Sequence, residues 1–230
     1  MSAGGGRTFV PSSKGRLTWR DAGRFSGDSL FDKIARVVCE AGCLPRKELY
    51  EAWETSRRVR RLFRGGRVVD VAAGHGLLAH AMLLLDDSSP SALVVDTAFP
   101  RSAGTLHEAL IAGWPRLAGR IAFLENSIDD VELLRSDVVV SNHACGNLTD
   151  RILDRSAAAG ARGAVLPCCH DLDTCDAGAF GGWLDGPLAI DVLRAVRLER
   201  RGYRVWTQAI PARVTPKNRL LLGAPDAAAV

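Results

Sequence analysis

The stretch "VVDVAAGHG" (Val68–Gly76) joins a run of β-branched apolar residues to a turn that contains two glycines. β-Branched residues favour strands, and a glycine has no side chain to prevent the backbone from turning sharply. The next ten residues, "LLAHAMLLLD" (77–86), predict a helix. The stretch is therefore typical of the first strand–turn–helix unit of an α/β sheet.

Strand-like and helix-like segments alternate through the rest of the chain. Further strands are predicted at 91–98, 120–126, 137–142 and 163–168, with helices at 102–114, 147–160 and 187–202. This alternation indicates parallel strands covered by helices on both faces. The last two strand-like runs, 203–210 and 218–225, leave no room for a crossover helix, so we expect an antiparallel pair. The fold class is α/β: a doubly wound, Rossmann-like parallel sheet with an antiparallel terminal hairpin.

Two further helices are predicted before this sheet. Residues 29–42 have apolar positions at helical spacing, and a second helix runs from Pro45 to about Phe63. We expect a flexible N-terminus over residues 1–27, a helical extension over 28–65, and the sheet domain over 66–230.

The bulk composition is that of an ordinary globular protein, 47% hydrophobic and 24% charged among 230 residues. No apolar run approaches the roughly 20 residues that span a bilayer, and the N-terminus lacks the apolar core of a signal peptide. Six cysteines in such a chain favour free thiols over a disulfide framework. The expected location is the cytoplasm, with no membrane partner.

Positive charge is concentrated in the second predicted helix. Helical spacing places Arg57, Arg60, Arg61 and Arg64 on one face. A solvated helix face and a patch that binds nucleic-acid phosphates both fit this pattern, and the sequence does not choose between them.

The predicted fold resembles class I S-adenosylmethionine (SAM) methyltransferases, which share the reversed final strand. "VVDVAAGHG" is similar to the first motif of that family, with Ala72 where a glycine is usual. The resemblance implies SAM as the cofactor. An NAD-type protein fits less well, because G-x-G-x-x-G is missing and the terminal hairpin is antiparallel. The expected cofactor residues are Asp70, Ala72, Gly74, His75 and Gly76 in this motif, Asp96 for the ribose hydroxyls, Ser127 and Asp129 for the adenine edge, and Asn142.

Two later stretches resemble a narrower branch of the family. "SNHACGNLTD" (141–150) and "PCCHD" (167–171) match the H-x-C-G and C-C-H motifs of eukaryotic tRNA ribose 2′-O-methyltransferases and related methyltransferase-like proteins. The closing "TPKNRLLLG" (215–223) also resembles their last hairpin. This resemblance implies RNA, specifically the ribose 2′-hydroxyl of tRNA, as the methyl acceptor.

Three chemistries compete for the cysteines and histidines of these stretches. Cys145, Cys168, Cys169, His170 and Cys175 contain enough ligands for zinc, yet no C-x-x-C pair is present. A disulfide between the adjacent Cys168 and Cys169 would be strained. We favour a methyl-transfer pocket without metal, in which His170 first and His143 second are the candidates for acid–base catalysis. The expected acceptor-binding residues are Cys145, Cys169, Asp171, Trp183, Arg57 and Arg61.

The sequence thus predicts a SAM-dependent methyltransferase that acts on oxygen or nitrogen, with RNA slightly ahead of a small molecule as the acceptor. The alternative from another class is a SAM-binding or metal-binding regulatory protein without catalysis. Nothing in the sequence indicates the oligomeric state.

Overall fold

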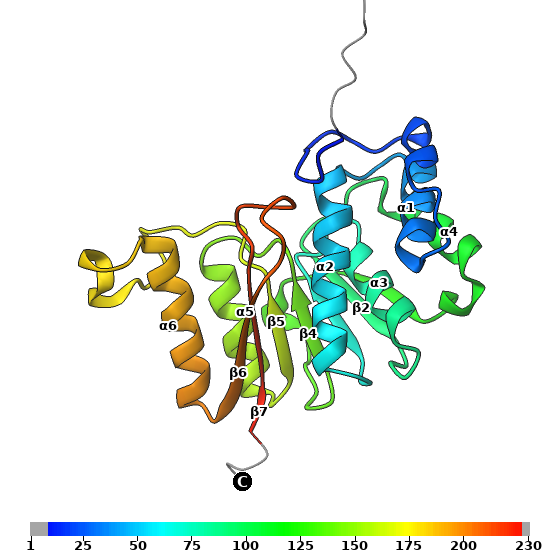
Figure 1. The fold of residues 1–230 in the computed structure, drawn as a ribbon. Coiled ribbons are helices and arrows are strands. Elements are labelled where there is room, and N and C mark those ends of the chain that lie inside the picture. The colour runs from blue at the N-terminus through cyan, green and yellow to red at the C-terminus, as the bar shows by residue number, and fades with distance from the viewer. Residues whose placement is uncertain (1–8, 227–230) are drawn as a thin grey trace, which may run out of the picture.

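A seven-stranded sheet forms the centre of the molecule, with the strand order β3-β2-β1-β4-β5-β7-β6 (Figure 1). The structure, a computed structural model, describes residues 9–226. The strands are β1 Val68–Val71, β2 Ala92–Asp96, β3 Ile121–Glu125, β4 Val138–Ser141, β5 Arg162–Val165, β6 Tyr203–Ala209 and β7 Arg219–Pro225.

The pairing of these strands confirms the predicted fold class. β1 pairs in parallel with β2 and β4, which places the carboxyl ends of β1, β2 and β4 at one edge of the sheet. β7 pairs antiparallel with both β5 and β6, so the terminal hairpin enters the sheet through its second strand. The polar segments after β1, β2 and β4 therefore meet at the same edge.

Helices cover both faces of the sheet, because successive residues in each strand point to opposite faces. One core contains Val138 and Val140 of β4 and packs under α1 Leu30–Ala41, α2 Arg46–Leu62, α3 Leu77–Leu85 and α4 Ala103–Gly113. The other contains Val139 and packs under α5 Asn147–Ala158 and α6 Gly186–Arg200. Figure 1 shows α6 beside the hairpin and α1 and α4 at the opposite end. No helix within residues 9–226 is both long enough and apolar enough to cross a membrane.

The segment before α1 differs from the flexible lead-in that the sequence suggests. Residues 1–8 of that segment lie outside the described residues. From residue 9 the chain packs onto the first core: Leu17 is fully buried, Phe25 is 3% exposed, and Trp19–Arg24 form a short 3₁₀ helix. Leu17 N donates a hydrogen bond to Leu44 O (2.9 Å), which fixes this segment against the start of α2.

The arginine face predicted for α2 is interrupted by Arg60. This side chain is 3% exposed and forms an ion pair with Asp86 (3.2 Å). It also donates hydrogen bonds to Met82 O (3.1 Å) and Ser89 Oγ (2.8 Å). Burial lowers the pKa of Arg60 to about 10, and the Asp86 carboxylate opposes that shift. Arg60 therefore joins α2 to the end of α3 and is not part of an exposed patch.

The buried pair predicts a contrast between two neighbouring arginines. Arg60→Ala should lower the free energy of unfolding by about 3 kcal/mol, because Asp86 loses its buried partner and keeps the exposed Arg64 at 3.7 Å. Arg61→Ala, on an exposed position of the same helix, should change it by less than about 0.5 kcal/mol. Urea unfolding of both variants measures the difference, and equal effects would contradict the assignment.

Candidate active site

The turn after β1 is anchored by Asp70, whose carboxyl group is buried beneath α3. Asp70 Oδ2 accepts a hydrogen bond from Ala79 N (3.0 Å), a free N–H in the first turn of α3. Gly76 precedes the helix and has no side chain to cap it. Asp70, from the strand, therefore accepts the hydrogen bond from Ala79 N in place of a cap residue. Burial raises the pKa of Asp70 to about 8, and the nearby Asp96 carboxylate adds to the increase.

The backbone of this turn enters the left-handed region three times. Ala72, Gly74 and Gly76 have φ values of 52°, 54° and 74°. A Cβ at Gly76 would also meet Val94 Cγ1 at 3.0 Å, so only glycine fits where the turn passes β2. Ala72 adopts this conformation with a side chain, at a cost of roughly 1–2 kcal/mol. The glycine usual in the resembled motif would avoid this strain.

Asp96 at the end of β2 holds the other side of the turn. Its Oδ2 accepts from Gly74 N (2.8 Å) and its Oδ1 from Thr97 N (2.8 Å). A cavity of about 150 Å³ opens beside it, bounded by Ala72, Asp96, Ser127 and Arg151 among others. Three of the predicted cofactor residues therefore line one cavity.

Asp129 and Arg151 form a polar pair at the rim of this cavity. Arg151 contacts the Asp129 carboxylate in an ion pair and donates a hydrogen bond to Ser127 Oγ (3.2 Å). Asp129 is thus engaged by Arg151, while Ser127 faces the cavity. Arg151, on α5, has no counterpart among the residues expected from the sequence.

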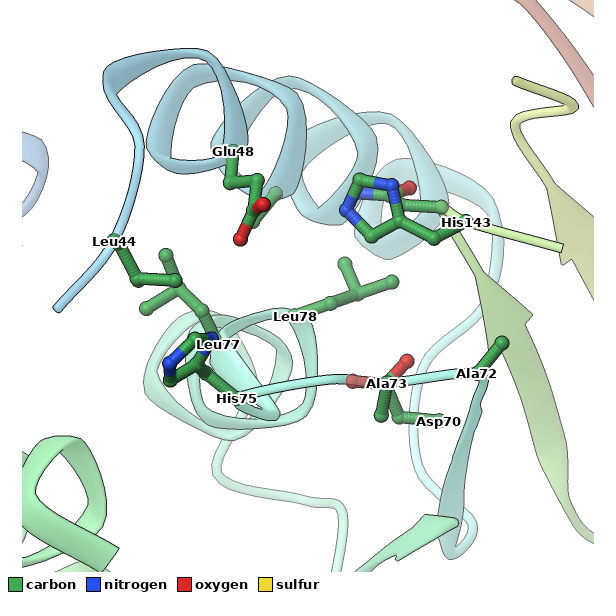
Figure 2. Close-up of a pocket in the computed structure, with 11 residues that line it drawn as sticks. Leu44, Glu48, Asp70, Ala72, Ala73, His75, Leu77, Leu78 and His143 are labelled. Carbon is green, nitrogen blue, oxygen red and sulfur yellow. The ribbon is translucent and has the colours of Figure 1, made fainter. Parts of the chain in front are cut away.

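A second, smaller cavity of about 20 Å³ lies on the other side of Ala72, under α2. Figure 2 shows Glu48 of α2 and His143, from the segment after β4, pointing into the space above the Asp70–Ala73 turn. Because Ala72 lines both cavities, they adjoin across the turn. The remaining lining residues are Leu44, Ala52, Ala73, His75, Leu77, Leu78 and Asn142.

The polar groups of the second cavity have perturbed protonation. Burial lowers the pKa of His143, an effect that Lys47 reinforces and that Glu51 and Asp96 oppose. Burial also lowers the pKa of His75, with a further contribution from Arg16, and raises the pKa of Glu48. Asn142 Oδ1 is buried without a hydrogen-bond partner. The cavity therefore holds neutral imidazoles at pH 7 and an unsatisfied acceptor.

His170, the first candidate for catalysis, does not line this cavity. Its Nε2 is hydrogen-bonded to Asp191 Oδ1 (2.8 Å), and its side chain is 2% exposed. Asp191 also pairs with Arg219 (2.7 Å) and, as expected from their spacing on α6, with Arg194 (3.3 Å). The structure places His170 in an ion-pair network between β7 and α6 and separates it from His143.

The acceptor-binding residues expected from the sequence also lie away from this cavity. Cys145 and Cys169 are exposed, and their backbones pair as an isolated parallel β-bridge; both thiols are free. Asp171 hydrogen-bonds within its own loop, to Thr174 Oγ1 (2.8 Å). Trp183 is 88% exposed.

Arg57 and Arg61 do not line the cavity either. Arg61 follows the cavity residue Ala52 by nine positions, which is about 14 Å along the helix and half a turn around it. Arg57 pairs with Glu54 (3.7 Å) on its own helix. The α2 arginines that remain exposed therefore face another part of the surface.

The sequence analysis missed the contribution of α2 to the cavity wall. Glu48 and Ala52 of α2 line it one helical turn apart, together with Leu44 just before the helix. The four-residue spacing of these positions is present in the sequence. The arginines later in the same helix suggested a solvent-exposed role instead.

The protonation of Asp70 predicts how stability depends on pH. Between its ordinary pKa of 3.8 and about 8, the folded chain keeps this carboxyl protonated while the unfolded chain ionises it. The unfolded state then binds fewer protons, so the free energy of unfolding falls as pH rises. His80, with a pKa lowered by burial to about 4 from 6.5, acts in the opposite direction below pH 6.5. The loss should be clearest from pH 6.5 to 8, at roughly 1 kcal/mol per pH unit.

Asp70→Asn removes this titration and should flatten the loss above pH 6.5. Chemical denaturation of the two proteins across that range measures the slopes. The same slope in both would contradict a protonated Asp70.

The sequence matches the family model of the methyltransferase domain over residues 48–174, more than half of the chain. No curated protein sequence matches it significantly.

Solved structures share the fold at low sequence identity. An O-methyltransferase family protein from Burkholderia thailandensis is 18% identical, with a TM-score of 0.54 and coverage of 93% of this chain and 65% of that one. Ribosomal protein L11 methylase from Lactobacillus delbrueckii subsp. bulgaricus is 16% identical, with a TM-score of 0.51 and coverage of 76% and 77%. Mitomycin 7-O-methyltransferase is 18% identical, with a TM-score of 0.50 and coverage of 91% and 61%. This chain thus spans less than two thirds of the first and third of these proteins. On the match over residues 48–174, the chain belongs to the methyltransferase domain family.

Proposed function

We propose that this protein is a SAM-dependent methyltransferase and that the two adjoining cavities hold the cofactor and the acceptor group. The main support for the proposal is that four polar residues line the two cavities around the turn after β1: Asp70, Asn142 and His143 line the smaller one, and Asp96 lines the larger one. Ligands of open α/β sheets bind outside the carboxyl ends of the strands, where this turn lies. SAM, when bound, supplies an electrophilic methyl group on a positively charged sulfur.

The residues present fit such a cofactor. Each oxygen of Asp96 accepts one backbone hydrogen bond, which leaves lone pairs for ribose hydroxyls. Asn142 Oδ1 is a buried acceptor without a partner and suits a donor such as an ammonium group. A cationic ligand beside Asp70 would favour the ionised carboxylate and lower its raised pKa. Ser127 and the Asp129–Arg151 pair bound the side on which the adenine is expected.

His143 suits the role of general base for a hydroxyl acceptor. Its lowered pKa keeps the imidazole neutral at pH 7, the form that accepts a proton. The Glu51 and Asp96 carboxylates raise that pKa, so they stabilise the protonated imidazole after transfer. We therefore place His143 ahead of His170, whose Nε2 is bound to Asp191.

This assignment predicts different outcomes for two histidine variants. His143→Gln should lower kcat by about 10²–10⁴ and remove the acid limb of the pH–rate profile, with SAM affinity retained. His170→Gln should keep that limb, because its imidazole does not take the acceptor proton. His107→Gln, on α4 outside the cavity, is the matched control. Loss of the acid limb in His170→Gln alone would overturn the assignment.

We propose RNA, through the ribose 2′-hydroxyl of tRNA, as the acceptor. Arg16 and Arg213, from distant parts of the sequence, lie near the first half of α2, where Lys47 is already paired with Glu51 (3.0 Å). The charges of Arg16 and Lys47 act on His75 and His143, and the charge of Arg213 acts on Tyr50 of α2. Arg16 and Arg213 are exposed, as a phosphate contact requires. This cationic rim replaces the α2 arginine face as the support for an RNA acceptor.

The rim predicts which arginines determine RNA binding. Arg16→Ala/Arg213→Ala should weaken RNA binding and reduce the slope of log affinity against log salt by about 0.7 to 0.9 for each phosphate that the protein no longer neutralises. The matched pair Arg57→Ala/Arg61→Ala, on the outer face of α2, should change neither. Titrations of tRNA at several salt concentrations measure both slopes. Equal effects of the two pairs would return the α2 face to consideration.

A small-molecule hydroxyl or amine is the second candidate acceptor. Leu44, Ala52, Leu77 and Leu78 contribute apolar side chains to the wall of the smaller cavity, so a compact organic group fits its chemistry, although at about 20 Å³ the cavity has to widen to admit one. Labelled SAM incubated with total RNA, and separately with an RNA-free extract of small molecules, distinguishes the two classes. Tight SAM binding without transfer in either arm would instead support a regulatory SAM-binding protein. The cytoplasmic location stays a prediction from the cysteine content.

A further inference from the structure

Three thiols converge from the two loops that follow β4 and β5. Cys145 follows β4, while Cys168 and Cys169 follow β5. Their sulfur atoms lie within 4.8 Å of one another: Cys145 Sγ is 3.2 Å from Cys168 Sγ, and Cys168 Sγ is 3.8 Å from Cys169 Sγ. A hydrogen bond from Gly146 N to Cys169 O (3.2 Å) holds the two loops together. The cluster is thus formed by the backbone arrangement of both loops.

These cysteines do not behave as core residues. A free cysteine in a protein is usually buried and acts as a small apolar group. Cys145 and Cys169 are exposed and Cys168 is half-buried, whereas Cys39 and Cys43 in the first core are buried. Packing therefore does not account for three thiols at one point of the surface.

The sulfur atoms are close to the spacing of a tetrahedral thiolate site: the Cys168–Cys169 separation of 3.8 Å equals it, and the Cys145–Cys168 separation of 3.2 Å is about 0.6 Å shorter. Zinc–sulfur bonds of about 2.3 Å at tetrahedral angles separate the sulfurs by about 3.8 Å. Adjacent residues of a strand point to opposite sides, which would prevent Cys168 and Cys169 from sharing an ion. β5 ends at Val165, however, and the irregular backbone after it lets both thiols turn the same way.

His170, directly after Cys169, has the environment of a metal-binding histidine. Its Nδ1 is buried and has no hydrogen-bond partner. Its Nε2 is hydrogen-bonded to Asp191, which Arg219 and Arg194 hold in place. Metal-binding histidines commonly direct their second nitrogen to a carboxylate in this way. Nδ1 lies outside the 4.8 Å thiol group, so the ring has to move toward the sulfurs to bind the same ion.

We propose that Cys145, Cys168 and Cys169 bind one zinc ion through their thiolates, with His170 Nδ1 as the fourth ligand. Soft sulfur ligands with one imidazole are the set that zinc prefers. Each cysteine releases its thiol proton to solvent on binding, so zinc affinity falls as pH is lowered. The ion fixes the segment that carries His143 to the loop after β5. This site differs from the metal-free pocket expected from the sequence.

The test is the zinc content and zinc affinity of the untagged full chain, purified in reductant without chelators. We expect one zinc per chain, and a sulfur-to-metal charge-transfer band when cobalt(II) replaces zinc. Cys145→Ser and Cys169→Ser should each weaken zinc binding more than about 100-fold, exceeding the 10- to 100-fold effect of losing an outer partner. Cys175→Ser is the matched control, because Cys175 lies in the same region and contacts Arg194 instead.

Three results would overturn the proposal. These are a chain without stoichiometric zinc, absence of the charge-transfer band, or a Cys145–Cys168 disulfide in the purified protein. If His170→Ala binds zinc as tightly as the wild-type protein, His170 is not the fourth ligand. Should a serine variant fail to fold, alkylation of the wild-type protein gives the answer: zinc should protect these three cysteines, mapped by mass spectrometry. None of these measurements depends on methyl transfer.

Discussion

The fold and the proposed site both depend on the buried carboxyl group of Asp70. It joins β1 to the first turn of α3 through Ala79 N, where Gly76 offers no cap. This hydrogen bond places the carboxyl group in a fully buried position, where loss of solvent raises its pKa to about 8. A carboxyl group that is neutral alone and ionises beside a cation is well suited to a cofactor with a positive charge. The same residue thus stabilises the turn and responds to the ligand proposed for it.

Helix α2 connects the core to the site. Arg60 and Val59 fix its second half to the first core, whereas Leu44, Glu48 and Ala52 at and before its first half close the cavity over the turn. A helix from outside the sheet thereby becomes one wall of the cavity (Figure 2). Because this wall contributes both apolar and acidic groups, α2 belongs to the site as well as to the fold.

The polar residues after β4 and β5 lie in different surroundings: some line the cavity, and the others lie in the thiol cluster or in the ion-pair network of Asp191. His143 and Asn142 face the cavity. Cys145, Cys168 and Cys169 form the thiol cluster on the neighbouring surface, and His170 joins the network of Asp191, Arg194 and Arg219. Arg194 also donates to Gly146 O (3.0 Å), which links α6 to the loop after β4. The two motifs are neighbours at one edge of the sheet, yet their side chains point to different surroundings.

The sequence by itself determined the succession of strands and helices along the chain, the antiparallel hairpin, the positions of Asp70 and Asp96 near strand ends, and the glycine turn that ends at Gly76. These features follow from local periodicity and from the backbone needs of a turn, which neighbouring residues specify. Only the tertiary structure decided that Arg60 is buried, that Glu48 faces His143 across a cavity, and that His170 is bound to Asp191. Such outcomes depend on contacts between residues far apart in the chain. A short sequence motif specifies which side chains are present, whereas the packing of helices on the sheet determines which partners they contact and how far they are buried.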